Sequence, residues 1–384
     1  MKISELKIAY FSDLVFPSNK VATKQILKTV ENLHQNEAQI ELFISTPLKK
    51  SKKKEIQKYY TVDKTLPINE IPFFLPPIPK VYRVPFTYFG IKKIQKQNFD
   101  LLYVRHYFHL KVGLAKNMKV LFETYKSSFS PKIMKPLISL LNTDENFVGM
   151  ITHSEMARQN WIKEGANPEK LITIHNGIDK TEIPQKMLIQ TARQKLEIDS
   201  DLKVISYIGN MGIYKDIESI LEIAKFLPDF TFYLVGFSES KDENRLKKHA
   251  ENLGLKNLVF IPWMSAAEVS VYLFASNALI IPPSSKPLLQ AGKTVLPLKT
   301  FMYLASGVPI LAPRLEDTAE LLKHKENSFL LTPDSPEENS KEISELFSDK
   351  KLMTKISENA FEQGKSLTWE NRAKKIIQFI EEKF

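Results

Sequence analysis

The sequence predicts an α/β protein made of two doubly wound, Rossmann-like domains that face a central cleft. Strand-like and helix-like segments alternate along the chain, which is the pattern of parallel sheets joined by crossover helices. With 384 residues, the chain is long enough for two domains of ordinary size. Because ligands bind such sheets beyond the carboxyl ends of strands, site residues are expected in the segments that follow strands.

The first half of the chain contains six segments whose apolar, strand-like character predicts a sheet. These are Lys7–Ser12, Gln39–Ser45, Leu101–Val104, Val120–Glu123, Gly149–Thr152 and Leu171–His175. Apolar residues at helical spacing predict helices over Thr23–Leu33 and Glu155–Glu164. Between Leu48 and Gln97, the prolines from Pro67 to Pro85 argue against long regular elements.

A second alternating series follows a linker that is placed near Thr181 to Lys195, where Pro184 lies in a polar stretch. The first domain is therefore expected to cover residues 1–185, and the second residues 186–366. The expected strands of the second series are Lys203–Ile208, Thr231–Val235, Leu258–Phe260, Ala278–Ile281, Pro309–Ala312 and Ser328–Leu331. The expected helices are Ile217–Phe226, Glu243–Leu253, Ala266–Ala275, Lys299–Ser306, Ser335–Ser348 and Trp369–Lys383.

Composition excludes several kinds of chemistry. The chain contains no cysteine, so disulfides, zinc–thiolate sites and thiol nucleophiles are ruled out. Glu5 and Asp13 interrupt any signal-peptide core, and no apolar run reaches the roughly 18 residues of a membrane span. His106, His109 and His153 lack metal-ligand spacing, so no metal site is expected. We expect a cytoplasmic protein.

Positive charge is concentrated in the first half, where residues 1–185 hold 28 Lys and Arg against 17 Asp and Glu. A lysine-rich segment precedes an aromatic, proline-containing one, which suits peripheral binding to an anionic inner membrane face. The lysines concerned are Lys49, Lys50, Lys52, Lys53 and Lys54. A solvated loop remains the alternative, and nucleic acid is disfavoured because no nucleic-acid-binding motif accompanies the charge.

Residues 294–312 carry the most specific motif. The run Pro-Leu-Lys-Thr-Phe-Met-Tyr-Leu-Ala-Ser-Gly-Val-Pro, residues 297–309, resembles the donor-site motif of GT-B fold glycosyltransferases of family four. His175 to Asp179 and Tyr207 to Asp216 resemble two further segments of that family. The resemblance implies a GT-B fold, a nucleotide-sugar donor bound by the second domain, and a final helix, residues 367–384, that returns to the first.

By this resemblance, the loop after the strand Lys203–Ile208 holds the donor diphosphate. Gly209 permits close backbone approach, and the following helix start presents free N–H groups to an anion. Lys215 and Lys299 supply positive charge, and Asn210 stands where many relatives have arginine. The alternative for Lys215 is a solvated lysine at a helix start.

The resemblance also implies further donor contacts at Gly236, Leu296 and Leu298. Met302 occupies the position of a glutamate that usually holds the donor ribose, and a thioether is only a weak hydrogen-bond acceptor. Met302 is therefore either a donor-site position that has lost its carboxylate or a core residue of its helix. Trp263 is expected to stack on the nucleotide base or to fill the core.

The first domain offers few candidates for catalysis. Glu123 and Tyr125 match a Glu-x-His segment of the family, with Tyr125 in place of the histidine, and no general base is identified. A glycine-rich loop that relatives carry after the first strand is absent. Residues on the acceptor side are expected to be Ser18, Asn19, Lys20 and Arg105.

The sequence thus predicts a retaining glycosyltransferase that moves a sugar from a nucleotide-sugar donor to an envelope polysaccharide, glycolipid or lipid-linked acceptor, without a metal or another cofactor. The alternative is a catalytically weakened GT-B module that binds a glycan or a partner transferase. Met302, Asn210 and Tyr125 favour this alternative. An epimerase on the same fold would need acids and a histidine that the sequence does not place.

Overall fold

The computed structural model describes residues 1–18, 20–47, 51–73, 79–179, 182–183, 185–238, 241–291 and 296–384. The chain divides into two compact units, Met1–Asn176 with Trp369–Phe384, and Gly177–Thr368. The first boundary lies before the one expected at residue 185, because Ile178 already packs with Leu296 and Phe301 of the second unit. The final helix belongs to the first unit.

Unit 1 is built on a parallel sheet with the strand order β3-β2-β1-β4-β5-β6-β7 among the described residues. The order reverses between β1 and β4, which is where doubly wound sheets bind ligands beyond their carboxyl ends. The strands are β1 (Lys7–Val15), β2 (Gln39–Pro47), β3 (Ile68–Phe73), β4 (Leu101–Val104), β5 (Val120–Thr124), β6 (Phe147–Thr152) and β7 (Leu171–Thr173).

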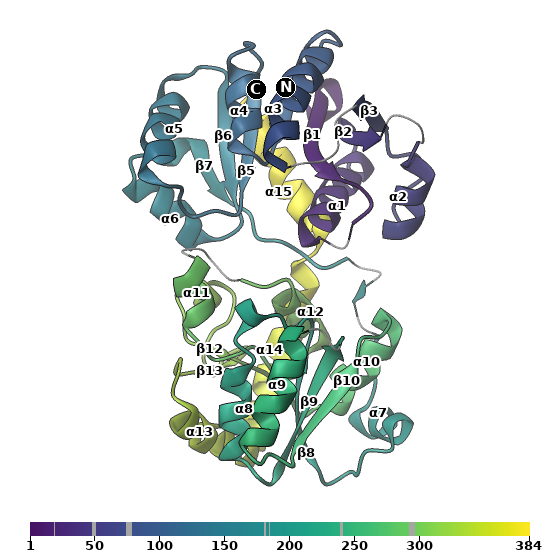
Figure 1. Ribbon diagram of the computed structural model, residues 1–384, viewed down its shortest axis with the longest axis vertical. Coiled ribbons are helices and arrows are strands. Elements are labelled where there is room, and N and C mark those ends of the chain that lie inside the picture. Colours follow the sequence, from purple (N-terminus) through teal and green to yellow (C-terminus); the bar gives the residue numbers. More distant parts are fainter. Residues whose placement is uncertain are drawn as a thin grey trace. The chain divides into compact units, whose positions relative to one another are not determined.

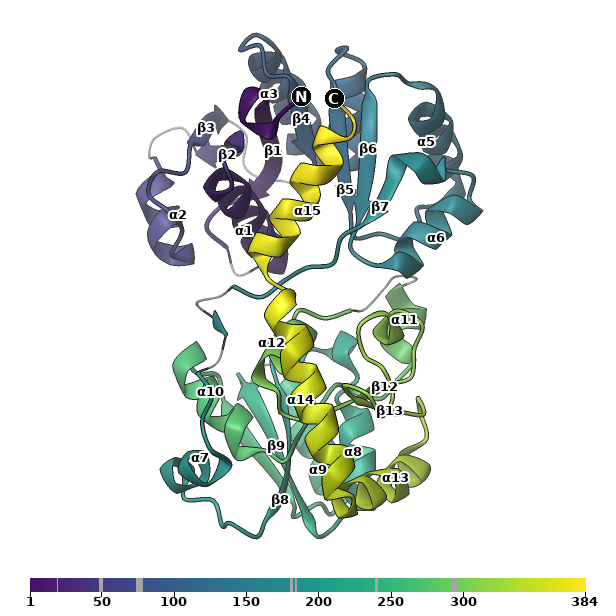
Figure 2. The ribbon, with the colours of Figure 1, turned by 180° about the vertical axis from the view of Figure 1, so that it is seen from behind.

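Helices cover both faces of this sheet (Figure 1). They are α1 (Val21–Gln35), α2 (Lys53–Tyr60), α3 (Pro79–Gln95), α4 (Tyr107–Leu114), α5 (Pro131–Thr143), α6 (Glu155–Lys163) and α15 (Trp369–Glu381). Alternate residues of β1 enter different cores: Tyr10 packs with the residues of α1 and α15, and Phe11 packs with those of α3. Figure 2 shows α15 alongside α1. Near-continuous burial of the strands follows from this double cover.

The expectation that residues 48–97 lack long regular elements is wrong. Helix α3 has 17 residues and contains Pro85 within it. A proline inside a helix costs about 3 kcal/mol, but burial of a large apolar side chain contributes about 1.5–3 kcal/mol. Phe86, Ile91 and Ile94 are all fully buried in the core against β1, so tertiary packing outweighs the local preference.

Unit 2 repeats the architecture with the strand order β10-β9-β8-β11-β12-β13, again parallel throughout the described strands. The strands are β8 (Lys203–Ile208), β9 (Phe230–Phe237), β10 (Leu258–Pro262), β11 (Ala278–Ile280), β12 (Ile310–Pro313) and β13 (Phe329–Leu331). The helices are α7 (Ile189–Leu196), α8 (Glu218–Lys225), α9 (Lys241–Asn252), α10 (Ala266–Ala275), α11 (Lys286–Ala291), α12 (Lys299–Ser306), α13 (Pro336–Ser348) and α14 (Lys350–Ser366). The strand order reverses between β8 and β11.

The two sheets confirm the prediction of two doubly wound, parallel, Rossmann-like domains. The strands predicted from the sequence are present, with ends that differ by a few residues, as β1 shows by continuing to Val15. Helix α7 (Ile189–Leu196) overlaps the stretch Thr181 to Lys195 that was expected to be the linker, so the linker is shorter than expected. Helices α2, α4, α5, α11 and α14 lie in segments without a predicted helix.

Candidate functional site

The turn after β8 brings backbone unusually close to the neighbouring strand. Gly209 has φ of 138° and Gly236, near the end of β9, has φ of 110°, a region that side chains rarely adopt. A Cβ atom on Gly236 would lie 2.8 Å from the carbonyl oxygen of Gly209. The two glycines are thus required for the strand ends to meet at the carboxyl edge of the sheet.

Lys299, the first residue of α12, points its ammonium group into this turn. Its Nζ atom is buried, has no hydrogen-bond partner among the described residues, and lies 3.4 Å from the ring centroid of Tyr207. A Cβ atom on Gly209 would lie 3.0 Å from the same Nζ. Burial, and then the charge of Lys215, lower the pKa of Lys299 well below its usual value. A buried cation without a counter-ion is costly, which marks the position as one that favours an anion.

Lys215 ends a short 3-10 helix, η4 (Ile213–Lys215), before Asp216 in a left-handed conformation. Lys215 is exposed to solvent, but neighbouring protein atoms displace part of the water around its ammonium group, and this desolvation lowers its pKa. Asp216, the adjacent acid, bonds Lys286 of α11 at 3.2 Å. Lys286 is a third cation at this loop, which sequence reasoning missed, because only the fold brings α11 beside η4.

Asn210 has a local role. Its Oδ1 atom accepts a hydrogen bond from the Gly212 amide at 2.9 Å, and its carbonyl accepts one from the Tyr207 hydroxyl at 2.6 Å. Such a side chain-to-backbone bond is a turn-forming contact, and it shapes the loop after β8. This contact gives Asn210 a reason to be present other than as a substitute for an arginine.

Met302 lies one helical turn after Lys299 on α12 and is half-buried. It packs against two apolar clusters, one with Tyr303 and Leu304 and the other with Leu296 and Leu298. Leu296 is buried and Leu298 is part-buried. These contacts fit a role for Met302 as a core residue of its helix, and its partial exposure fits a position in a donor site. Trp263, which follows β10, is 76% exposed, so the core reading of that residue is wrong.

In unit 1, Glu123 of β5 is the centre of a buried ionic network. Its carboxylate accepts hydrogen bonds from Arg372 of α15 at 2.9 Å and from the Tyr103 hydroxyl at 2.5 Å. Arg105 lies 3.8 Å away. Burial raises the pKa of Glu123, but Arg372 and Arg105 outweigh it and hold the pKa below its usual range. Glu123 therefore ties the returning helix to the sheet of unit 1.

Tyr125 is also occupied by protein contacts. Its hydroxyl donates a hydrogen bond to Asn176 at 2.6 Å, its ring stacks on His153, and the guanidinium of Arg105 lies 4.2 Å from the ring centroid. Burial raises the pKa of Tyr125 to about 12. A phenol held in this way does not provide a base near neutral pH.

The described residues expected on the acceptor side gather around the start of α1. Ser18 bonds Tyr60 and Thr23, close to the start of α1, while Asn19 lies outside the described residues. Lys20 is exposed at the N-cap of α1. Arg105 donates hydrogen bonds to Gln25 and to the carbonyl of Ala22.

Among the lysines expected at a membrane, Lys49 and Lys50 lie outside the described residues. Lys53 and Lys54 begin helix α2, and Lys52 at its N-cap pairs with Glu55 at 2.5 Å. No helix in the described ranges is long and apolar enough to cross a membrane.

A cluster that sequence reasoning missed lies at the carboxyl ends of β1 and β4. Asp13 receives a hydrogen bond from Arg83 of α3 and lies 3.6 Å from Nε2 of His109. Nη1 of Arg83 lies 3.0 Å from Nε2 of His106. Together with Arg105 and Lys126, these side chains line a cavity of about 220 Å³. The available signal was that Asp13 follows the predicted strand Lys7–Ser12 and that the two histidines follow the predicted strand Leu101–Val104.

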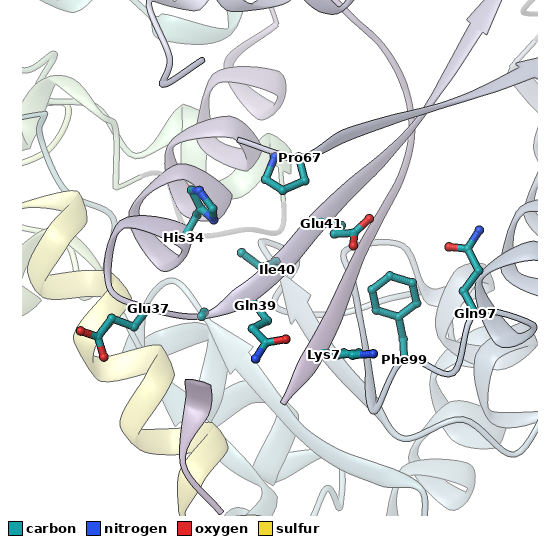
Figure 3. Close-up of a pocket in the computed structure, with 10 residues that line it drawn as sticks. Lys7, His34, Glu37, Gln39, Ile40, Glu41, Pro67, Gln97 and Phe99 are labelled. Atoms are coloured by element: carbon teal, nitrogen blue, oxygen red, sulfur yellow. The ribbon is translucent and has the colours of Figure 1, made fainter. Parts of the chain in front are cut away.

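A second cavity in unit 1, of about 460 Å³, is lined by Lys7, Gln39 and His34 (Figure 3). Lys7 and Gln39 are the first residues of β1 and β2, so this cavity lies at the amino edge of the sheet. Ligands of doubly wound sheets bind at the opposite edge. Within the described part of the chain, no three His, Asp or Glu side chains gather as a metal site would require.

Comparisons with known proteins agree with this geometry. Residues 189–363 match the family model "Glycosyl transferases group 1". An uncharacterized glycosyltransferase of Haemophilus influenzae is 28% identical over 217 residues, which are 55% of each chain. The alignment thus spans about half the length of that relative. The putative glycosyltransferase YtcC of Bacillus subtilis is 23% identical over 309 residues, 74% of this chain and 73% of YtcC.

The chain is also similar to a third curated relative and to a solved structure. The lipopolysaccharide core biosynthesis glycosyltransferase LpsE of Rhizobium meliloti is 24% identical over 176 residues, 46% of this chain and 48% of LpsE. The crystal structure of Anabaena HepE in complex with UDP superposes with a TM-score of 0.76 at 17% identity, covering 98% of this chain and 100% of HepE. Residues 189–363 therefore match the group 1 glycosyl transferases, and the chain has the two-domain, Rossmann-like fold of GT-B glycosyltransferases.

Proposed function

We propose that this protein is a retaining glycosyltransferase resembling family four, which transfers a sugar from a nucleotide-sugar donor to a polysaccharide, glycolipid or lipid-linked acceptor. The observation that carries the proposal is the buried ammonium group of Lys299 beside the glycine turn of unit 2. It has no acidic partner among the described residues, Lys215 lies close by, and both face the carboxyl edge of a doubly wound sheet. A diphosphate is the anion that such a donor provides.

In this proposal the lysines act on the leaving group. Breaking the bond between sugar and phosphate places a growing negative charge on the diphosphate, and preorganised cations stabilise that charge most effectively where water is excluded. Lys299 is already desolvated, and Gly209 leaves space for the phosphates to approach it. The solvent-exposed ring of Trp263, after β10, is available to stack on the nucleotide base.

The proposal requires no protein base. Glu123 is held by Arg372 and Tyr103, and Tyr125 is bonded to Asn176 with its pKa raised to about 12. The leaving phosphate then accepts the proton of the acceptor hydroxyl on the same face of the sugar, which gives retention of anomeric configuration. No metal is required, because Lys215 and Lys299 supply the neutralising charge.

The acceptor class follows from the relatives. LpsE is named for lipopolysaccharide core biosynthesis, and HepE was crystallised with UDP. We infer an envelope glycan or a lipid-linked acceptor, and a uridine nucleotide as the first donor to test. The lysine-rich start of α2, where Lys54 is exposed and Lys52 and Lys53 are part-exposed, supports a peripheral position on an anionic membrane surface, where each lysine contributes about 1 kcal/mol.

Calorimetric titration of the full chain with UDP, GDP and ADP, followed by the matching nucleotide sugars, tests the donor site. We expect one nucleotide to bind in the micromolar range and its sugar conjugate to be hydrolysed slowly or transferred. If a folded sample binds none of the three nucleotides, the proposal is wrong.

A second candidate function is a GT-B module that binds a glycan or a partner transferase without turnover. The observation in its favour is the packing of Met302 against two apolar clusters, at the position where the resemblance to family four implies a ribose-binding acid. Nucleotide binding without hydrolysis or transfer of any nucleotide sugar would favour this candidate.

A further inference from the structure

The cavity of about 220 Å³ in unit 1 lies at the carboxyl ends of β1, β4 and β5, beside the reversal of strand order. Most of its lining is apolar or aromatic, but the charged side chains in it are mainly cationic: Arg83, Arg105 and Lys126 stand against Asp13, the only acid that lines it among the described residues. A cavity of this size suits one charged group or one sugar ring, and not a longer oligosaccharide. Positive charge in a small cavity at this edge of the sheet favours an anion.

Arg83 is anchored so that part of its guanidinium group stays available. Its Nε donates to Asp13, which fixes the side chain and offsets one positive charge. The side chain is 31% exposed, and among the described residues the one polar neighbour of its remaining N–H groups is Nε2 of His106. An arginine held by one edge in this way presents its other edge for paired hydrogen bonds to a carboxylate or a phosphate.

The contact between Arg83 and His106 is unfavourable without a ligand. Nδ1 of His106 accepts the Phe108 amide at 3.1 Å and caps α4, so the proton of a neutral ring is on Nε2. That N–H then faces Nη1 of Arg83, a second donor, at 3.0 Å. Burial and the charge of Arg83 lower the pKa of His106 to about 4, so the ring is neutral at pH 7. Two donors therefore face each other and lack a shared acceptor.

We propose that Arg83 and His106 form a binding site for an oxyanion, the carboxylate or phosphate group of the acceptor. One oxygen placed between the two donors would accept a hydrogen bond from each, and Lys126 would add longer-range attraction. The assignment of the anion to the acceptor rests on the proposed function. The binding of an oxyanion at this site is argued from the residues of unit 1 alone.

The test follows His106 by NMR in the full chain labelled at histidine, with the resonance assigned through His106→Asn. Asparagine keeps the cap of α4 and removes the Nε2 donor. D-glucuronate and glycerol phosphate are titrated separately, with D-glucose as the neutral match for glucuronate. We expect either anion to shift the His106 resonance and raise its pKa above about 4, and glucose to leave both unchanged.

Arg83→Gln is expected to weaken anion binding about tenfold or more, the usual effect of losing hydrogen bonds to a charged group. Arg158→Gln is the matched control, since Arg158 is also an ion-paired, part-exposed arginine of unit 1 but does not line the cavity. A larger response to glucuronate indicates a uronic acid, and a larger response to glycerol phosphate indicates a phosphate-bearing acceptor.

The charged and titratable groups that face His106 are Arg83 from α3, Asp13 from β1, Lys126 after β5 and His109 from α4. An oxyanion beside them favours the charged ring, so its affinity is expected to rise as pH falls from 7 towards 5. If neither anion shifts His106, or if Arg83→Gln and Arg158→Gln bind equally well, the proposal is overturned. These readings need no nucleotide, so they stand apart from failure of the donor site.

Discussion

Replacing Lys299 by methionine should weaken nucleotide binding and stabilise the fold at the same time. Methionine preserves the length of the side chain and its contact with the Tyr207 ring, but it removes a buried charge that has no hydrogen-bond partner. An unsatisfied buried polar group costs about 1–3 kcal/mol, while a cation–π contact returns about 0.5–2 kcal/mol. The expected gain in the free energy of unfolding is therefore about 1 kcal/mol.

The effect on binding has the opposite sign. A hydrogen bond to a charged group contributes about 1.5–3 kcal/mol, so the Kd of the bound nucleoside diphosphate should rise about 10- to 150-fold. Calorimetric titration measures the Kd, and thermal unfolding measures the change in stability. For a domain of this size, 1 kcal/mol corresponds to about 2–4 °C in Tm. Lys203→Met, on β8 at its exposed amino end, is the control.

The difference in stability between Lys299→Met and wild type should also depend on pH. Because folding lowers the pKa of Lys299, the penalty of burying its charge is fully present below the folded pKa and fades as pH rises from there towards the unfolded pKa of about 10.4. A variant that loses stability at pH 7 while its nucleotide affinity is unchanged would refute the reasoning, because Lys299 would then be a structural cation.

Three further variants test the rest of the site. Gly236→Ala should lower the stability by more than Gly254→Ala does, because Gly254 also has a positive φ but has open space around it. Equal decreases in Tm for the two variants would exclude the close strand contact at Gly236. Glu123→Gln should cost about 3–5 kcal/mol by leaving Arg372 buried without its counter-ion. Since Glu123 has a lowered pKa, the stability that it confers is present above its unfolded pKa of about 4.3 and is lost as pH falls through the folded value; acid unfolding of wild type should therefore be steeper than that of the variant. Met302→Glu should tighten nucleotide binding if a donor pocket has lost its acid, whereas a loss of stability without tighter binding would assign Met302 to the core.

The sequence determined the fold class because its signals are local. Strand-like runs such as Lys203–Ile208 are buried on both faces of a parallel sheet and are recognisable without their neighbours. The glycine turn after β8 and the motif around Lys299 were equally readable, since backbone freedom and charge are properties of single residues. The segment around Pro85 was misread because burial of Phe86 and Ile91 outweighs a local proline cost.

Only the tertiary structure decided which residues meet. Asp13, Arg83 and His106 are far apart in sequence, and they converge because parallel strands place their carboxyl ends at one edge of the sheet. Lys286 joins the loop of Asp216 for the same reason. The sequence supplied Glu123 and Tyr125 as candidates for catalysis, but their roles depended on partners from α15 and from the end of unit 1, which no local pattern reveals. Local chemistry thus determined the helices, the strands and the glycine turn after β8, whereas long-range packing determined which charged side chains meet in each unit.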